Sequence, residues 1–196
     1  MNDSREHILK TAFSLFVTKG YKAVTMQDLE NATKLTKGAF YHYFKSKEEL
    51  FQAVIEKYYL PDMLICQAGN VKSLDEYIKL HISCLREKML GIKDITGGPM
   101  PDPHYISLIL EAKKYFPVLS NRIKDTFRGQ TNQWEKIIVN AKESGEIKTN
   151  IETSALAEIF TSIGLGIIKN LIMDDSLEYS ISKIILQYEQ LYRLLR

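Results

Sequence analysis

Helical spacing of apolar residues, broken by helix-end signals, is the feature that most constrains the fold of this chain. Apolar residues recur three and four positions apart through nearly all of the sequence, and no segment shows the strict alternation of a half-buried strand. Ser46 and Ser73 each precede a glutamate by three positions, which is the pattern of a helix N-terminus. Gly20 and Gly145 stand where helices are expected to end. These signals predict an all-α chain of about nine helices.

Further signals predict the ends of individual helices. Thr25 and Thr36 are expected to be the N-caps of two short helices. A longer helix is expected from Ser73 to about Leu90, followed by a loop over the Gly- and Pro-rich stretch 91–103. Pro103 suits the first position of the next helix, because proline lacks the N–H that would be unpaired there.

Composition excludes several classes of protein. Hydrophobic residues make up 45% and charged residues 26% of the 196 residues, which is typical of a globular chain with a real core. No run of 18 apolar residues is present, and the charged start MNDSREHILK lacks a signal core, so we expect a cytoplasmic protein without a membrane span. Cys66 and Cys84 fit a reducing compartment as free thiols, although a disulfide between them stays open.

The positive charge of the chain is concentrated near its start. Residues 1–50 hold eight Lys and Arg against six Asp and Glu, whereas the other 146 residues hold 18 of each kind. The window 34–47 carries four lysines and no acidic residue. A local basic patch on a balanced chain indicates a polyanionic partner at one end, although a solvated charged face would give the same pattern.

The same window contains a short helix with two different faces. At 100° per residue, one face of residues 36–43 is small and aromatic, and is expected to pack inward: Thr36, Ala39, Phe40 and Tyr43. The opposite face presents hydrogen-bonding groups: Lys37, Gly38, Tyr41 and His42. An exposed face of donors, with a glycine that permits close backbone approach, suits a DNA groove. Lys45 and Lys47 stand near the start of the next helix and are positioned for phosphates.

The stretch T-x-x-D-L-x-x-A-T-x-L-T-K-G-A-F-Y-H-Y-F-K-S-K-E-E-L resembles the DNA-binding domain of the TetR family of regulators. The preceding LKTAFSLFVTKGYKAVT is similar to the first helix and turn of that family, so the resemblance covers about residues 5–52. Two positions depart from the pattern: Lys34 stands where similar proteins commonly have glycine, and Glu30 stands where they commonly have alanine. Lys34 is therefore expected to adopt a left-handed or similarly tight conformation, at a cost of about 1 kcal/mol.

The resemblance implies a three-helix, helix-turn-helix DNA-binding domain at residues 1–46 and a larger helical effector-binding and dimerisation domain at 47–196. It places Thr25 and Thr36 at phosphates, Lys37 at a phosphate or a guanine edge, and Tyr41, His42 and Lys47 at the DNA backbone. Together with the basic and glycine positions above, the candidate DNA contacts are Thr25, Lys34, Thr36, Lys37, Gly38, Tyr41, His42, Lys45 and Lys47.

The last two helices are expected to form a dimer interface. The final helix repeats apolar residues with a/d spacing, and the helix before it is apolar on more than one side, with glycines that permit close approach. A seam that packs on its own subunit would show the same spacing. The resemblance implies a four-helix interface, and a dimer would present two recognition helices to a two-fold site. The candidate interface residues are Ile163, Gly166, Ile167, Ile181, Ile184, Tyr188, Leu191 and Leu195.

The middle of the chain is where the resemblance implies an effector pocket. A mixed aromatic and methionine lining suits a hydrophobic or aromatic small molecule, although each such residue also suits plain core. The candidate ligand-binding residues are Tyr77, His81, Met89, Tyr105, Phe127 and Trp134. His81 and Cys84 share a helix face but lack the further ligands of a zinc site, so no metal or cofactor is expected. No phosphate-binding glycine loop or catalytic arrangement is recognisable, and we do not expect an enzyme.

These patterns predict a homodimeric regulator that binds a palindromic operator on double-stranded DNA and represses until a small-molecule effector releases it. Two alternatives stay open: a ligand-independent regulator controlled by a protein partner, and a binding protein that no longer recognises DNA because Lys34 spoils the turn. The choice between repression and activation depends on the position of the operator, and the identity of the effector is not written in the sequence.

Overall fold

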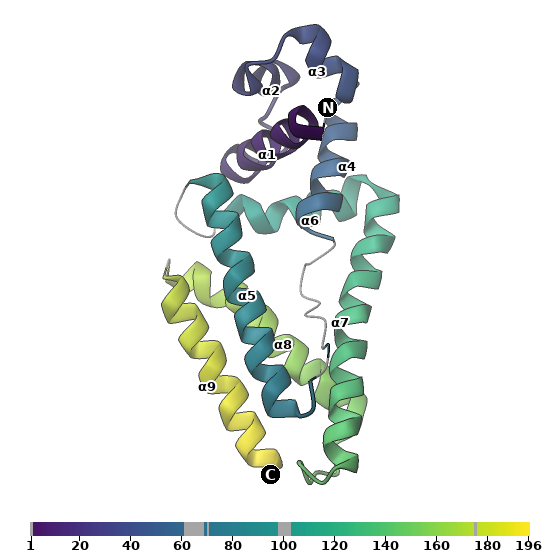
Figure 1. Ribbon diagram of the computed structural model, residues 1–196, viewed down its shortest axis with the longest axis vertical. Helices are drawn as coiled ribbons and strands as arrows, with labels where there is room; N and C mark the ends of the chain where they lie inside the picture. Colours follow the sequence, from purple (N-terminus) through teal and green to yellow (C-terminus); the bar gives the residue numbers. More distant parts are fainter. Residues whose placement is uncertain (1, 61–68, 70, 98–102, 175) are drawn as a thin grey trace. The chain divides into compact units, whose positions relative to one another are not determined.

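The computed structural model describes residues 2–60, 69, 71–97, 103–174 and 176–196, and within these ranges the chain forms nine helices and no strand (Figure 1). The prediction of an all-α fold is therefore confirmed. The helices are α1 Asn2–Lys19, α2 Met26–Thr33, α3 Lys37–Tyr43, α4 Lys47–Tyr58, α5 Leu74–Thr96, α6 Pro103–Tyr115, α7 Pro117–Glu143, α8 Thr153–Met173 and α9 Leu177–Leu195.

The helix ends follow the local signals closely. Gly20 and Gly145 both have positive φ, 80° and 74°, as expected for residues that end helices. The side chains of Thr25, Thr36 and Ser46 each accept a hydrogen bond from the backbone N–H three residues later.

The prediction of a loop over residues 91–103 is wrong over part of its length. Residues 91–96 were expected to lie in a loop but form the last turns of α5, and Gly97 follows with φ 67°. The reason is that the apolar spacing of α5 continues past Met89 to Ile92, which is buried. Residues 98–102 of the predicted loop lie outside the described residues, and α6 begins at Pro103 as expected.

The chain divides into two compact units, with one boundary inside α5 and another inside α7. Unit 1 comprises residues 1–63 and 92–124, and unit 2 comprises residues 64–91 and 125–196. In unit 1, α1 packs against α2, α4 and α6. The division of the chain at residues 46 and 47 stays a prediction.

Unit 1 is built around an aromatic core beneath α2 and α3. The ring of Phe51 on α4 lies 5.5 Å from that of Phe16 on α1, 4.1 Å from Tyr21 and 5.3 Å from Phe116. Aromatic rings contribute large apolar areas and prefer such tilted or edge-on contacts. The first helices of the chain therefore pack on a well-filled aromatic core.

Unit 2 has an aromatic cluster at its centre, formed by Tyr77, His81, Trp134, Phe160 and Tyr188. The Trp134 ring lies 4.6 Å from Tyr77 and 4.8 Å from Phe160, and the Tyr188 hydroxyl donates to the Phe160 carbonyl at 2.9 Å. All five side chains are buried. A β-carbon on Gly164 would lie 2.8 Å from His81 Nε2, so glycine is required where α8 passes the cluster.

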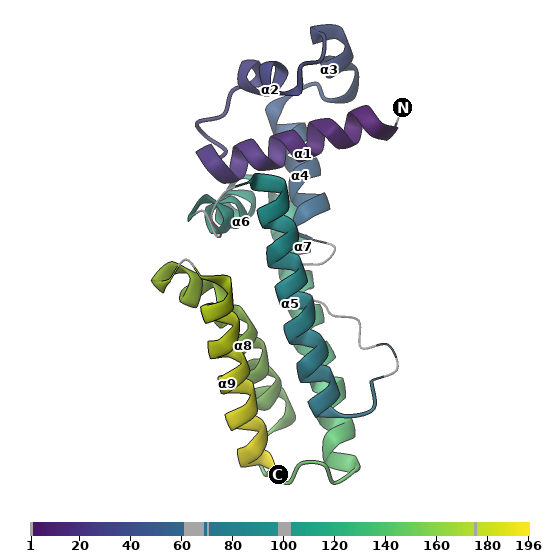
Figure 2. The same ribbon diagram turned by 60° about the vertical axis from the view of Figure 1, so that its left-hand side comes forward.

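Helices α8 and α9 lie side by side in unit 2 (Figures 1 and 2). By length and composition alone α8 is apolar enough to cross a membrane, with a mean hydropathy of 1.5 over its best window, and 44% of that window is buried in the structure. Core helices of water-soluble proteins have the same composition. Packing against α9 and the aromatic cluster accounts for the buried side of α8.

The expectation of a free Cys84 is not met, since this residue is disulfide-bonded. The chain has one other cysteine, Cys66, which lies outside the described residues.

Candidate nucleic-acid interface

The candidate interface is built from α2, α3 and the turn between them. Thr25 and Asp28 form a reciprocal cap at the start of α2: the Asp28 N–H donates to the Thr25 hydroxyl at 3.1 Å, and the Thr25 N–H donates to the Asp28 carboxylate at 2.9 Å. The Thr25 hydroxyl also donates to the Asp28 carboxylate, at 2.6 Å, and this bond together with that from the Thr25 N–H lowers the pKa of Asp28. The Thr25 hydroxyl is therefore committed to the cap, while the residue stays on the surface.

The turn between the helices depends on Lys34. Its φ of 56° and ψ of 21° are left-handed, and it has the only positive φ of any non-glycine residue in the described part of the chain. The predicted tight conformation is therefore confirmed. The turn is supported from α1, where His7 Nε2 lies 3.0 Å from the Thr33 carbonyl oxygen. The Lys34 side chain is exposed.

Helix α3 is held by one buried side chain and exposes most of the rest. Phe40 is fully buried, whereas Lys37, Gly38 and His42 are exposed. A β-carbon at Gly38 would meet no atom within 4 Å. Thr36 and Ala39 were expected to pack inward, but both are exposed, because Phe40 is the one side chain of this short helix that is fully buried. The helix thus offers an open surface with close access to its backbone.

Tyr41 links α3 to α2. Its hydroxyl donates a hydrogen bond to the Glu30 carboxylate, and this bond raises the pKa of Tyr41. The Lys37 ammonium lies 5.9 Å from the centre of the Tyr41 ring. The sequence marks Glu30 as a departure from the family pattern but gives no sign of its partner, because no local pattern joins positions eleven residues apart across a turn.

The two lysines after α3 are engaged within the protein. The Lys45 ammonium donates to the Tyr41 carbonyl at 2.9 Å, and its side chain is otherwise exposed. The Lys47 ammonium donates to the carbonyls of Tyr21 and Val24 at 3.1 and 2.9 Å, and it lies 4.4 Å from the centre of the Tyr21 ring. Lys47 therefore stabilises the turn between α1 and α2.

Replacing Lys47 by methionine is expected to lower the free energy of unfolding by about 2 kcal/mol, because two backbone carbonyls lose a charged donor. The matched change Lys45→Met removes one hydrogen bond at the surface and should cost less than about 1 kcal/mol. Urea unfolding followed by circular dichroism measures both values. Equal losses for the two variants would contradict the structural role of Lys47.

The candidate ligand-binding residues fall in both units. Tyr77, His81 and Trp134 belong to the aromatic cluster of unit 2. Met89 and Phe127 lie in the same unit outside that cluster, and Met89 is buried whereas Phe127 is half-buried. Tyr105 instead belongs to unit 1. Its ring stacks on that of Tyr59 at 4.8 Å, and its carbonyl accepts a hydrogen bond from the Tyr59 hydroxyl at 2.9 Å.

The candidate dimer residues also divide into two groups. Five of them are buried within their own subunit and are not available to a partner: Ile167, Ile181, Ile184, Tyr188 and Leu195. Their a/d spacing reflects packing of α9 on the core of unit 2, which corrects the assignment of this seam to an interface. Ile163, Gly166 and Leu191 remain partly exposed.

The fold and the site define a class of protein. Two short helices joined by a tight turn, with the second exposing polar side chains, form a helix-turn-helix. Residues 8–54 match the sequence pattern of the family described as bacterial regulatory proteins, tetR family. The predicted resemblance to the TetR family of transcriptional regulators is therefore confirmed over this segment of the chain.

Curated relatives share this sequence similarity, and solved structures share the fold. The transcriptional repressor NemR of Escherichia coli K12 is 38% identical over 77 residues, which cover 36% of this chain and 39% of NemR. The chain spans 20%, 34% and 39% of the lengths of three curated relatives that it matches, NemR among them.

Two solved structures share the fold over 99% of this chain, each at 18% identity and a TM-score of 0.71. A TetR-family regulator from Cytophaga hutchinsonii matches over 95% of its own length, and SmeT, in complex with triclosan, over 92%.

Proposed function

We propose that this protein is a DNA-binding transcriptional regulator that acts as a homodimeric repressor in the cytoplasm. The observation that carries the proposal is the exposed face of α3, where Lys37, Gly38 and His42 are accessible on the side of the helix away from the buried Phe40. This face suits the major groove, where side chains reach base edges and a glycine allows close approach.

The candidate DNA-contacting residues differ in whether their side chains are free to bind DNA. Lys34 and Lys37 have exposed side chains suited to phosphates or a guanine edge, and Thr36 and His42 are exposed beside them. Lys45 remains a phosphate candidate at the surface. Lys47 stabilises the structure beneath the interface and is not itself a phosphate contact, because its ammonium already has two carbonyl partners.

The test is a binding selection on genomic fragments with the purified full-length chain. We expect enrichment of one palindromic site whose half-sites are centred about 34–36 Å apart, because two α3 helices related by a two-fold axis must enter successive major grooves. Affinity for the selected site should fall steeply with salt. A folded protein that enriches no sequence at low salt would overturn the proposal and favour a protein without DNA recognition.

Glu30 is expected to weaken DNA binding. Its carboxylate holds the Tyr41 hydroxyl and places a negative charge beside the face that approaches phosphates. Glu30→Ala should therefore raise operator affinity about fivefold, which corresponds to roughly 1 kcal/mol of repulsion near water. Fluorescence anisotropy with the selected operator measures the change, and Gln27→Ala on the same helix is the neutral control. Weaker binding of Glu30→Ala would show that Glu30 serves to position Tyr41.

We further propose that a small aromatic molecule bound in unit 2 releases the operator. The polar atoms of Gln130 and Trp134 on α7 and both ring nitrogens of His81 are buried without a hydrogen-bond partner among the described residues. Burial lowers the pKa of His81 to about 4, so its ring is neutral at pH 7 and offers one donor and one acceptor. Buried polar atoms of this kind favour a ligand with matching groups.

The effector would act by preferring one of two conformations of the regulator. To shift occupancy from one state to the other almost completely, it must bind the released state about 10⁴-fold more tightly. Compounds made or degraded by products of the genes beside the operator are the first to test, with triclosan, the ligand of SmeT, as an aromatic reference. Operator release that is lost in Gln130→Leu supports the proposal. Release that persists in this variant would contradict the site.

A further inference from the structure

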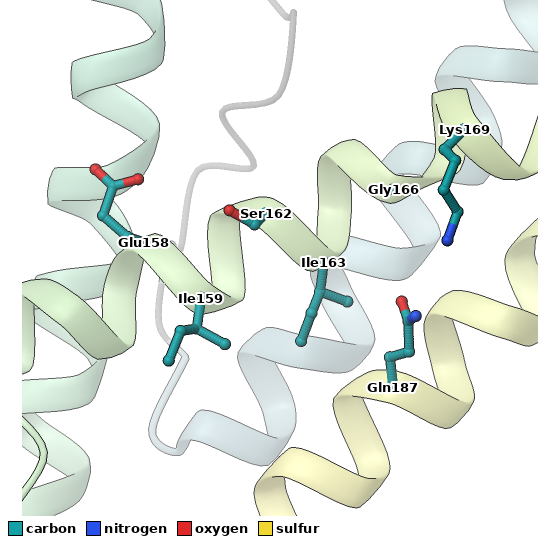
Figure 3. A pocket seen from close by; sticks show the side chains of 7 residues that line it. All are labelled: Glu158, Ile159, Ser162, Ile163, Gly166, Lys169 and Gln187. Carbon is teal, nitrogen blue, oxygen red and sulfur yellow. The ribbon is translucent and has the colours of Figure 1, made fainter.

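Two open surfaces among the described residues differ in how closely their side chains define a partner. An open groove of about 450 Å³ on α8 is lined by acidic, basic and apolar side chains, among them Glu158, Ile163 and Lys169 (Figure 3). A lining of such mixed chemistry favours no single kind of group. The exposed start of α3 is more selective, because residues 37–43 carry hydrogen-bond donors and a methyl group but no carboxylate and no carboxamide.

The first turn of α3 is the part of the helix suited to base edges. The N-terminal residues of a recognition helix contact bases in the major groove, and in α3 these are Lys37, Gly38 and Ala39, all exposed. The hydroxyl of Thr36 is already used, because it accepts the Ala39 N–H at 3.3 Å as the N-cap. The side chains left to distinguish bases in this turn are therefore those of Lys37 and Ala39.

Gly38 lies between these two side chains and faces away from the protein. At about 100° per residue it is roughly 160° around the helix from the buried Phe40, with Lys37 about 100° to one side and Ala39 about 100° to the other. A β-carbon on Gly38 would meet no atom within 4 Å, so the backbone itself can approach the floor of a groove. Lys37 and Ala39 would then reach different base pairs, one on each side of this approach.

The Lys37 ammonium matches guanine. It has donors only, and guanine has two acceptors, N7 and O6, at its major-groove edge, whereas adenine and cytosine each present an amino donor there. The ammonium lies 5.9 Å from the centre of the Tyr41 ring, one turn further on, so the side chain extends along the helix. The exposed Lys34 and Lys45, before and after the helix, are left for phosphates.

The Ala39 methyl group matches thymine. An alanine methyl group packs on the C5 methyl group of thymine in the major groove, and cytosine, the other pyrimidine, lacks that methyl group. Spacing around the helix predicted that Ala39 packs inward, and its exposure in the structure leaves it free to contact a base. Ala39 therefore joins the candidate DNA contacts as a residue that the sequence pattern had assigned to the core.

We propose that each operator half-site presents a guanine to the Lys37 ammonium and a thymine methyl group to Ala39, with Gly38 approaching the base pairs between them. The inference rests on the DNA-binding function proposed above and adds the identity of two bases and the residues that read them. It also assigns Lys37 to a base edge and leaves the phosphates to the lysines that flank α3.

A change of specificity tests the guanine contact. Glutamine pairs with adenine through N6 and N7, so a binding selection with Lys37→Gln in the full chain should replace guanine by adenine at one position of each half-site and keep the other positions. The matched control is Lys45→Gln, which removes the same charge from an exposed side chain outside the helix. It should weaken binding to all sites alike and lower the slope of log affinity against log salt by about 1. Circular dichroism checks that both variants are folded.

Base analogues in the selected operator test both contacts with the unchanged protein. Replacing the guanine by 7-deazaguanine removes the N7 acceptor and should lower affinity about tenfold. Replacing the thymine by uracil removes only the methyl group and should lower affinity about threefold. The same replacements outside the half-sites should leave affinity unchanged.

The outcomes separate this inference from the function on which it rests. A Lys37→Gln variant that keeps the guanine, or that only weakens binding to every site, would overturn the Lys37 contact. Affinity that is unchanged by uracil at every thymine of the half-sites would overturn the Ala39 contact. In both cases a selected palindromic site leaves the DNA-binding regulator standing, whereas a folded chain that enriches no sequence overturns the regulator and this inference together.

Discussion

Replacing Lys37 and Tyr41 together by alanine is expected to lower affinity for the selected operator by about a hundredfold at physiological salt, since contacts of this kind contribute roughly 1–3 kcal/mol each. Lys37 lies on the exposed face of α3, and Tyr41 lies beside it. Phe40 stays buried in the variant, so α3 should remain folded and packed on unit 1.

Fluorescence anisotropy across a salt series separates this effect from a general loss of charge. The slope of log affinity against log salt should fall by about 1 in the double variant if Lys37 neutralises one phosphate. The matched control is Lys114→Ala with Tyr115→Ala on α6, where the ammonium also lies over the tyrosine ring, at 5.1 Å. Equal losses in both double variants would contradict the assignment of α3 to DNA.

Replacing Trp134 by alanine is expected to lower the free energy of unfolding by about 3–5 kcal/mol, because it removes the largest ring of the aromatic cluster and leaves a cavity. The ring is fully buried and contacts Tyr77 and Phe160. Trp134→Phe should cost much less, since the indole N–H has no partner among the described residues to lose.

Urea unfolding followed by far-ultraviolet circular dichroism measures these values. Val139→Ala on the same helix is the control: this side chain is 40% exposed and its truncation should cost less than about 1 kcal/mol. A loss for Trp134→Ala no larger than for the control would contradict the central place of the aromatic cluster in unit 2.

The parts of the fold that sequence predicts well are those set by short-range chemistry. Thr25, Thr36 and Ser46 begin helices because their side chains accept hydrogen bonds from N–H groups only three residues away. Lys34 was expected to be left-handed from its position in the helix-turn-helix, and it is. The resemblance of residues 8–54 to the TetR family and the all-α fold follow from these local agreements.

Contacts between distant residues could not be predicted in the same way. The carbonyl partners of Lys47 lie 23 and 26 residues earlier in the chain, and spacing within α4 carries no sign of them. The a/d spacing of Ile181 and Ile184 showed which side of α9 is apolar but not which surface covers it. Periodicity indicates that one face of a helix is buried, but only the three-dimensional structure shows which residues cover that face.

Methylation interference on the selected operator tests the central claim, that α3 reads the major groove. Methyl groups on guanine N7 project into the major groove, whereas those on adenine N3 project into the minor groove. We expect guanine N7 methylation within each half-site to block binding at two positions about one helical turn apart, or a multiple of it. Binding that tolerates methylation at every guanine N7 but is blocked at adenine N3 would contradict the account.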